Sequence, residues 1–232
     1  REETRLVSLS DCVVCSSRQL QASFGRNGVE ANYVPHGVDW QLFRTAVDSS
    51  LTVPEDLATI PRPRLGFYGF LSDEWVDYDL LHEIASRKPN WHVVLIGKPK
   101  AGMSMDRMLS RPNLHYLGLK PFEELPAYTQ HFDVGLIPFV RNELTASSNP
   151  LKLLEYLSGG LPVVTTDIPE VDKYKGLVHV AGSAEEFVKK CQTAIDTDSP
   201  ADRHRRSDSV RSHSWDERVK QLSQVLSTAD PK

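Results

Sequence analysis

Short apolar runs alternate along the chain with longer segments in which apolar residues recur at helical spacing. The short runs are rich in branched and aromatic residues, as β-strands are. They cover residues 12–16, 33–35, 64–70, 92–97, 114–117, 133–138, 162–166 and 177–181. Most of the segments between them are long enough for a helix of about ten residues. This alternation predicts strand–helix–strand units and therefore a parallel sheet.

Capping residues mark where several of the predicted helices begin. Asp77 precedes YDLLHEIASRK, and Pro121 precedes FEELPAYTQHF. Ser183 and Ser214 are each followed three residues later by a glutamate, which is the pattern of a capping box. The strands LGFYGF, VVLIG and VGLIP are apolar on both faces, as strands covered by helices on both sides are. We therefore predict an α/β fold with a doubly wound, Rossmann-like parallel sheet of about six strands.

The two ends of the chain differ from this central pattern. Residues 1–45 hold one strand–helix–strand unit, and the polar, proline-containing stretch 46–62 is predicted to connect it to the rest. The Rossmann-like domain would then cover 63–200, and 201–232 would form a C-terminal helical segment. The arginines between residue 196 and the last helix are expected on a solvated helix face. Because the chain begins with Arg1, we expect it to be a piece of a longer product.

Composition narrows the function mainly by exclusion. A formal net charge of −4 over 232 residues argues against a broad basic surface for nucleic acid. No apolar run approaches the roughly 20 residues that span a membrane. Cys12 and Cys15 are predicted on opposite faces of one strand, which suits neither a redox pair nor a metal clip, and a reducing cytoplasm fits. The histidines lack ligand spacing, so no metal site is predicted.

A ligand of such a sheet is expected beyond the carboxyl ends of the strands. Neither GxGxxG nor GxxxxGK[ST] occurs in the chain, so two common phosphate-binding loops are unsupported. The best candidate is the stretch SSNPLKLLEYLSGGLPVVTT. Ser148 or Asn149 can cap its helix, with Pro150 at the first helical position. The N–H groups of Leu151 and Lys152 would then point out of the helix start, where phosphate binds well.

The charges of this helix admit two interpretations. Lys152 opposes the helix dipole in the first turn, and Glu155 follows three residues later. Counting 100° per residue places the leucines on one arc, against the sheet, and Lys152, Glu155 and Tyr156 on the other, where a ligand could lie. The same two charges could instead be a solvated pair worth a few tenths of a kcal/mol. Spacing alone leaves both interpretations open.

Several motifs together resemble the GT-B glycosyltransferases of family 4, also called group 1. NPLKLLEYLSGGLPVVTT is similar to their donor-site segment, which has a glutamate-bearing helix, a turn of small residues and G-x-PVV. CVVCSSRQLQASF and NYVPHGVDWQLF resemble the end of the N-terminal domain, with His36 in the usual asparagine position. LGFYGFLSDEWVDYDLL, WHVVLIGKP, FDVGLIPF and SWDERVKQL resemble the nucleotide-sugar-binding domain and its final helix, which crosses back. The chain is especially similar to bacterial polysaccharide enzymes of the teichuronic-acid type.

The resemblance implies a hexosyltransferase-type enzyme that moves sugar from a nucleoside diphosphate sugar, such as a UDP-sugar, to a polysaccharide or glycolipid acceptor. It implies that the enzyme requires no cofactor and no metal ion and that nucleic acid is not among its partners. Residues 1–45 would end the acceptor-side domain. The protein is expected in the cytoplasm, at the inner face of the membrane, with peripheral membrane association through the missing domain. Because acceptor-side groups belong to that domain, no catalytic residue is assigned, and this piece alone is expected to bind the donor but to be inactive.

The resemblance also assigns roles to single positions. Glu155 corresponds to the family glutamate that binds the donor ribose, and Lys152 to a lysine that contacts the diphosphate in related branches. The helix start, with Ser148, Asn149, Pro150 and Leu151, would add backbone donors.

Three loops before this helix complete the predicted site. Gly69 and Phe70 correspond to the glycine turn that approaches the phosphates, and Leu119 and Lys120 to the loop that reads the base through its main chain. The cations that often follow the glycine turn in the family are missing here, so Lys98 is expected to share the diphosphate charge with the helix lysine.

One departure from the family keeps other functions open. Its E-x7-E pattern requires a glutamate at position 147, where this chain has Ser147, while Glu143 lies at the wrong spacing. A non-catalytic nucleotide-sugar-binding or scaffold domain therefore remains an alternative. A nucleotide-sugar epimerase of the same architecture is a second alternative, although it needs acid and base groups that the motifs do not show.

Overall fold

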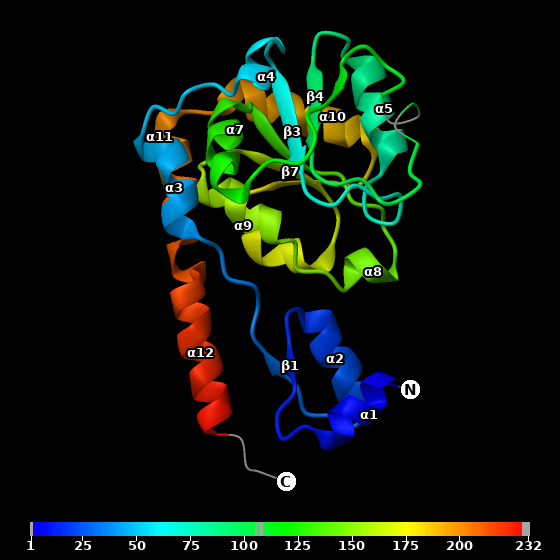
Figure 1. The fold of residues 1–232 in the computed structure, drawn as a ribbon, viewed down its shortest axis with the longest axis vertical. Helices are drawn as coiled ribbons and strands as arrows, with labels where there is room; N and C mark the ends of the chain where they lie inside the picture. Colours follow the sequence, from blue (N-terminus) through cyan, green and yellow to red (C-terminus); the bar gives the residue numbers. More distant parts are fainter. Residues whose placement is uncertain (1, 105, 107–108, 229–232) are drawn as a thin grey trace.

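The computed structural model describes residues 2–104, 106 and 109–228 (Figure 1). Its main feature is a parallel sheet of six strands in the order β5-β4-β3-β6-β7-β8. The strands are β3 Arg64–Tyr68, β4 His92–Ile96, β5 Leu114–Tyr116, β6 Val134–Ile137, β7 Val163–Thr166 and β8 His179–Ala181. The order reverses between β3 and β6, as it does in doubly wound folds. The predicted α/β class and the number of strands in this sheet are confirmed.

Helices cover both faces of this sheet. One face packs against α5 (Tyr78–Arg87) and α10 (Ala184–Thr197). The other packs against α7 (Leu125–His131) and α9 (Leu151–Ser158), which are covered in turn by α3 (Trp40–Asp48) and α11 (Pro200–Ser209). The shorter elements are α4 Glu55–Ala58, η1 Phe122–Glu124, α8 Glu143–Ala146, η2 Pro169–Tyr174 and η3 Arg211–His213. As the apolar runs predicted, β3 and β6 are buried along their whole length.

The predicted helix starts agree closely with the structure. Asp77, Ser183 and Ser214 each accept a hydrogen bond from the N–H group three residues later. The capping box at Ser183 is only half formed, because the Glu186 carboxylate accepts from the N–H of Gly182 instead. These local signals fix where α5, α10 and α12 (Trp215–Ser227) begin.

The N-terminal unit, residues 2–33, lies apart from the large sheet (Figure 1). It contains α1 (Glu2–Leu9), α2 (Arg18–Arg26) and two short parallel strands, β1 (Val14–Cys15) and β2 (Asn32–Tyr33). The last helix, α12, extends from the larger part of the molecule alongside this unit. The chain's three cysteines are free. The proposed division at residue 45 stays a prediction, and α3 crosses it without a break.

One expectation about the C-terminal region is wrong. Arg205 is exposed as predicted, but Arg206 is only 7% exposed and belongs to the core of the molecule. Its Nε donates to the carbonyl of Gly160 at 2.8 Å, and its guanidinium pairs with Asp198. The arginine is buried because α11 packs against α9, whose last turn leaves the Gly160 carbonyl without a helical partner.

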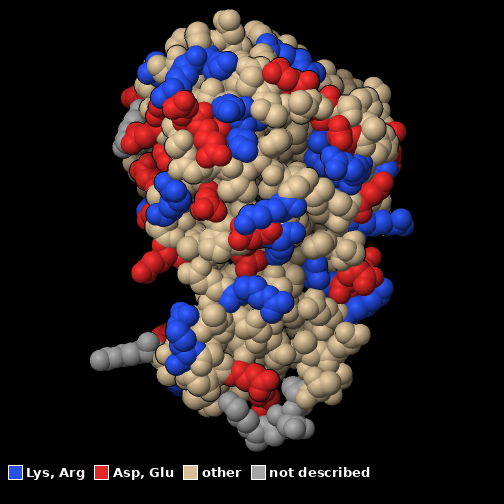
Figure 2. Space-filling view, turned by 180° about the vertical axis from the view of Figure 1, so that it is seen from behind, with Lys and Arg blue, Asp and Glu red and all other residues tan. Residues whose placement is uncertain are grey.

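The surface shows no dominant charge. On the face in Figure 2, lysines and arginines are interspersed with aspartates and glutamates. Within the described residues, no helix is both long and apolar enough to cross a membrane. The described part of the chain also contains no group of three or more His, Cys, Asp or Glu side chains suited to hold a metal ion.

Candidate functional site

Two adjoining cavities lie where β3, β4 and β5 end. The Glu155 cavity has a volume of about 400 Å³, and its walls come from the three strand-end loops and from α9. The His36 cavity, of about 380 Å³, lies between the start of α9 and the segment that follows β2. Phe70, Leu151 and Lys152 line both cavities. This position, at the carboxyl ends of the strands and next to the reversal of strand order, is where open α/β sheets bind ligands.

Every residue predicted for the site lines one of these two cavities. The Glu155 cavity contains those from the strand-end loops and the first turns of α9, namely Gly69, Phe70, Lys98, Leu119, Lys120, Leu151, Lys152 and Glu155. The His36 cavity contains Ser148, Asn149 and Pro150. The sequence therefore brought together residues that the fold places around one continuous region.

Two glycines allow the loops after β3 and β4 to approach each other. Gly69 and Gly97 have φ angles of +145° and +139°, which side-chain-bearing residues rarely adopt. A Cβ atom on Gly97 would lie 1.8 Å from the carbonyl oxygen of Gly69, and one on Gly69 would lie 3.0 Å from Cε of Lys152. Because both residues are glycines, no side chain prevents Lys152 from reaching the cavities next to the turn after β3.

The start of α9 differs from the prediction. Pro150 is the N-cap and Leu151 the first helical residue, and neither Ser148 nor Asn149 caps the helix. The Ser148 hydroxyl donates to the carbonyl of Thr145 at 2.7 Å, and the Asn149 amide donates to the carbonyl of Ser16 at 3.0 Å. The N–H of Leu153 donates to the carbonyl of Pro150 at 3.0 Å, whereas the N–H groups of Leu151 and Lys152 have no acceptor within the helix and remain available to an anion.

The prediction that Glu155 and Tyr156 lie with Lys152 on an open face of α9 is also wrong. Tyr156 is fully buried and Glu155 is 6% exposed, because α3 and α11 cover this helix. The Tyr156 ring points toward the sheet, where Gly135 of β6 leaves room for it, and its hydroxyl accepts from the N–H of Tyr68 at 3.1 Å. Leu151, by contrast, is partly exposed and lines both cavities. A solvated lysine–glutamate pair is therefore incompatible with the structure.

Lys152 is a partly buried cation at the start of α9. In the described part of the chain it forms no ion pair, and its Nζ lies 5.2 Å and 4.8 Å from the ring centres of Phe67 and Phe139. Burial lowers the pKa of Lys152 to about 8, although Glu155 acts in the opposite direction. Burial likewise raises the pKa of Glu155 to about 7 against the attraction of Lys152. An anion placed in the cavities would compensate the cost of keeping this lysine charged.

The rest of the Glu155 cavity is largely apolar. Phe70, Leu119 and Phe122 are substantially exposed around it, and such apolar surfaces can pack against the face of a planar ring. The Lys120 ammonium is paired with Asp56 at 2.5 Å, so this residue offers the cavity its main chain rather than its charge. Lys98 is exposed at the rim. The buried hydroxyl of Tyr68, which also lines the cavity, has no hydrogen-bond partner among the described residues.

The His36 cavity contains residues that the sequence did not assign. Ser16 and His36 come from the N-terminal part of the chain, while Trp75 and Phe139 form an edge-to-face pair with ring centres 5.5 Å apart. None of the described residues that line this cavity is an aspartate or a glutamate. The histidine in the PHGVD motif was the one signal that could have identified this wall.

Neither Ser147, at the altered position of the E-x7-E pattern, nor the nearby Glu143 contributes to the cavities. Ser147 caps the C-terminal end of α8, and Glu143 is exposed in the first turn of that helix. Neither lines the Glu155 cavity or the His36 cavity. The structure therefore provides no replacement carboxylate at this position within the described residues.

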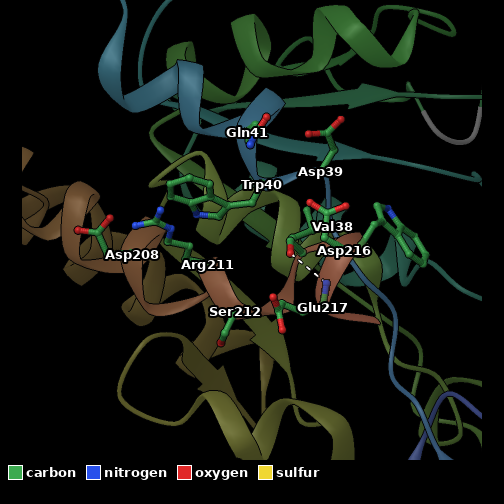
Figure 3. A pocket seen from close by; sticks show the side chains of 11 residues that line it. Val38, Asp39, Trp40, Gln41, Asp208, Arg211, Ser212, Asp216 and Glu217 are labelled. Carbon is green, nitrogen blue, oxygen red and sulfur yellow. Dashed lines mark hydrogen bonds between the residues drawn. The ribbon is translucent and has the colours of Figure 1, made fainter. Parts of the chain in front are cut away.

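A larger cavity, of about 700 Å³, lies between α3 and the start of α12 (Figure 3). Its wall includes the carboxylates of Asp39, Asp208, Asp216 and Glu217. The guanidinium of Arg211 lies 5.2 Å from the ring centre of Trp40, on the wall of this cavity. The excess of carboxylates is unfavourable for a diphosphate, and none of the predicted site residues lines this cavity.

Known proteins resemble this chain in sequence and in fold. A Bacillus subtilis (strain 168) protein named as a teichuronic acid biosynthesis glycosyltransferase, TuaH, is 29% identical over 182 residues, which are 74% of this chain and 44% of that protein. The chain thus spans less than half the length of this relative.

Two solved structures show the similarity of fold. Sucrose-phosphate synthase from Thermosynechococcus elongatus superposes with a TM-score of 0.74 and 16% identity, over 97% of this chain and 60% of that one. Anabaena HepE in complex with UDP-glucose gives a TM-score of 0.76 and 16% identity, over 94% of this chain and 64% of that one. The predicted GT-B fold is confirmed.

The family described as "Glycosyl transferases group 1" matches residues 62–197, from just before β3 to the end of α10. This segment includes six strands, both glycine turns and α9. It covers more than half of the chain, and the chain therefore belongs to the group 1 glycosyl transferases.

Proposed function

We propose that this chain binds a nucleoside diphosphate sugar and forms the donor-binding half of a glycosyltransferase. The observation that supports this most strongly is the environment of Lys152. A partly buried ammonium, which pairs with no carboxylate among the described residues, lies at the start of α9, where two cavities meet. The diphosphate of a nucleotide sugar supplies the negative charge that this position lacks.

The two cavities suggest how the donor lies. The base and ribose would occupy the Glu155 cavity, with the base against its apolar wall and the ribose hydroxyls donating to the Glu155 carboxylate. The diphosphate would accept hydrogen bonds from Lys152 and from the first N–H groups of α9. The sugar would extend into the His36 cavity. The complex of the Anabaena protein with UDP-glucose supports a uridine nucleotide as the first donor to test.

The proposed reaction breaks the bond between the anomeric carbon and the diphosphate oxygen while an acceptor hydroxyl oxygen bonds to that carbon. The leaving diphosphate keeps the electron pair of the broken bond, and the acceptor loses a proton. Lys152 and the N–H groups of α9 would stabilise the developing negative charge from fixed positions. In this proposal the electrostatic part of catalysis requires no metal ion.

The acceptor remains the less defined substrate. The similarity to TuaH supports a carbohydrate or lipid-linked acceptor in polysaccharide synthesis. Since the chain spans 44% of that relative, we propose that acceptor binding depends on the rest of a longer protein. The cytoplasmic location and the membrane association stay predictions. The epimerase alternative gains no support from the His36 cavity, whose described lining contains no carboxylate.

Calorimetric titration of the 232-residue chain with UDP, GDP and ADP tests the proposal. We expect at least one of them to bind. Lys152→Ala should weaken that binding about 10- to 100-fold, because a charge-assisted interaction with phosphate is lost, and should change the binding of the free nucleoside little. Glu155→Ala should weaken nucleoside and nucleotide alike. Lys220→Ala, which removes an exposed lysine on α12, is the matched control. Failure of all three nucleotides to bind would favour the scaffold alternative.

A further inference from the structure

His36, like Ser16 on the same cavity, comes from outside the matched family segment. It follows β2 and lines the His36 cavity opposite the start of α9. Its ring forms no hydrogen bond with any described residue, whereas Ser148 and Asn149 across the cavity are bonded to protein carbonyls. The imidazole is therefore a free hydrogen-bonding group in a cavity with few others.

The main chain around His36 is held by α12 and by η3, which precedes it. The Nε of Arg218 lies 3.3 Å from the carbonyl oxygen of His36, to which it donates. The N–H of Val38 donates to the carbonyl of His213 at 2.9 Å, and Trp215 packs so closely on Gly37 that a Cβ there would lie 2.7 Å from its ring. These contacts fix the position of the histidine before any ligand binds.

The surroundings of His36 favour its neutral form. Burial lowers the pKa of His36, and the nearby ammonium of Lys173 lowers it further. Lys173 is itself held in place by Glu170 and by the Tyr33 hydroxyl, each at 2.8 Å. A neutral imidazole has one nitrogen that donates and one that accepts, which suits a sugar hydroxyl that can also do both.

The occupant of this cavity follows from its position. The diphosphate is proposed at Lys152, which belongs to both cavities, and the nucleoside in the cavity that contains Glu155. The part of the donor beyond the diphosphate must then extend past Pro150 toward His36 and Trp75. Trp75 offers an aromatic surface to the apolar face of a sugar ring, and His36 offers the polar contact.

We propose that His36 is a sugar-binding residue, whose imidazole exchanges hydrogen bonds with a hydroxyl of the glycosyl group to be transferred. This inference rests on the proposed function. The segment after β2 would then be part of the donor site and would contribute to its specificity for the sugar. Lys152 and α9 would recognise what all donors share, and His36 what distinguishes them.

The test compares each sugar nucleotide with its own diphosphate. The probes are UDP, UDP-glucose, UDP-glucuronate, GDP and GDP-mannose, titrated into the wild-type chain, His36→Ala, His36→Asn and His36→Gln. We expect His36→Ala to weaken the preferred sugar nucleotide about tenfold, as the loss of one hydrogen bond would, and to leave its diphosphate within about twofold. One of the two amide variants should restore part of the affinity and so identify the ring nitrogen used. The matched control is His179→Ala, which removes a partly buried histidine that lines a different cavity.

Each other outcome counts against the proposal. An equal loss of affinity for the diphosphate and the sugar nucleotide would assign His36 to folding or to phosphate binding. Unchanged affinity, or a wild-type chain that binds a sugar nucleotide no more tightly than its diphosphate, would remove the sugar contact while leaving the proposed donor site intact. A wild-type chain that binds no probe would overturn the proposed function together with this inference.

Discussion

Lys152→Met is expected to stabilise the ligand-free protein while it weakens binding of a nucleoside diphosphate. Methionine has nearly the length of lysine, so it should keep the contacts with the rings of Phe67 and Phe139. It removes the partly desolvated charge, which has no carboxylate partner among the described residues. Opposite effects of one substitution on stability and binding would distinguish a binding site from a structural ion.

The expected gain in stability follows from the environment of the lysine. A fall in its pKa from 10.5 to about 8 corresponds to about 3 kcal/mol, at about 1.4 kcal/mol per tenfold change. Because the side chain lines two open cavities, solvent reduces this penalty to roughly 2 kcal/mol. The variant also loses the attraction between the ammonium and the two rings, which offsets about 1 kcal/mol of this gain in stability. The free energy of unfolding should therefore rise by about 1 kcal/mol at pH 7.

The sign of the pH dependence provides a second test. The folded-state pKa of Lys152 lies below its unfolded value, so the penalty is fully present below pH 8 and is lost as the pH rises toward 10.5. The stability advantage of Lys152→Met should shrink over that range. Glu155 loses the attraction of the ammonium in the variant, so its pKa there should rise above the value of about 7 that it has beside Lys152. Its own penalty disappears in both proteins as the pH falls toward 4.5.

Urea unfolding at pH 7 and pH 9.5, followed by tryptophan fluorescence, measures the stability, and calorimetry with the preferred nucleotide measures the affinity. The nucleotide affinity should fall at least about tenfold. Lys98→Met, which removes an exposed lysine at the rim of the same cavity, should leave the stability nearly unchanged. A Lys152→Met protein that is less stable than the wild type by 1 kcal/mol or more would refute the reasoning, since the lysine would then stabilise the fold itself.

Two further substitutions test the packing behind the site. Gly97→Ala should destabilise the protein by more than about 2 kcal/mol, because the new Cβ would collide with a backbone carbonyl; Gly25→Ala, where nothing lies within 4 Å, is its control in thermal unfolding. Arg206→Ala should cost about 3 kcal/mol in urea unfolding because it breaks a buried ion pair, whereas Arg205→Ala should cost less than about 0.5 kcal/mol. Equal stability within either pair of variants would contradict the packing described here.

The fold was predictable because its signals are local and repeated. Six apolar runs of strand length, separated by segments of helical period, specify a parallel sheet whatever the details of packing. The capping residues of α5, α10 and α12 act on the turn that follows them, so the sequence next to each helix is sufficient. The short strands of the N-terminal unit were overestimated, since they pair with one neighbour only and lie outside the large sheet.

The grouping of the candidate residues around the cavities was predictable where it depends on strand ends and a helix start. In a parallel sheet, the loops after β3, β4 and β5 must meet at one edge, which places Gly69, Lys98 and Leu119 around one cavity. The details of α9 were less accessible. A helical wheel separates two arcs, but it cannot show that α3 and α11 cover the side of α9 that does not face the sheet, nor that Gly135 of the facing strand makes room for Tyr156.

What the sequence could not provide was the contact between distant segments. Asn149 binds the carbonyl of Ser16, and Arg206 binds the carbonyl of Gly160, over separations of 133 and 46 residues. Such partners depend on tertiary packing, which no local pattern encodes. The same limit concealed His36, which precedes Lys152 by more than a hundred residues and yet lines the same cavity.

The position of Lys152 in the first turn of α9, where a cation opposes the helix dipole, was an informative feature of the sequence. A lysine in the first turn of a helix opposes the dipole, and its partial burial without a described carboxylate partner removes part of its solvation as well. The fold keeps both unfavourable arrangements at the same residue, at the junction of two cavities. An anionic ligand would relieve the two together, because it would bind the ammonium and the first N–H groups of α9 at once. Local frustration at this position is therefore an argument for a bound diphosphate rather than for an error in the packing of the helix.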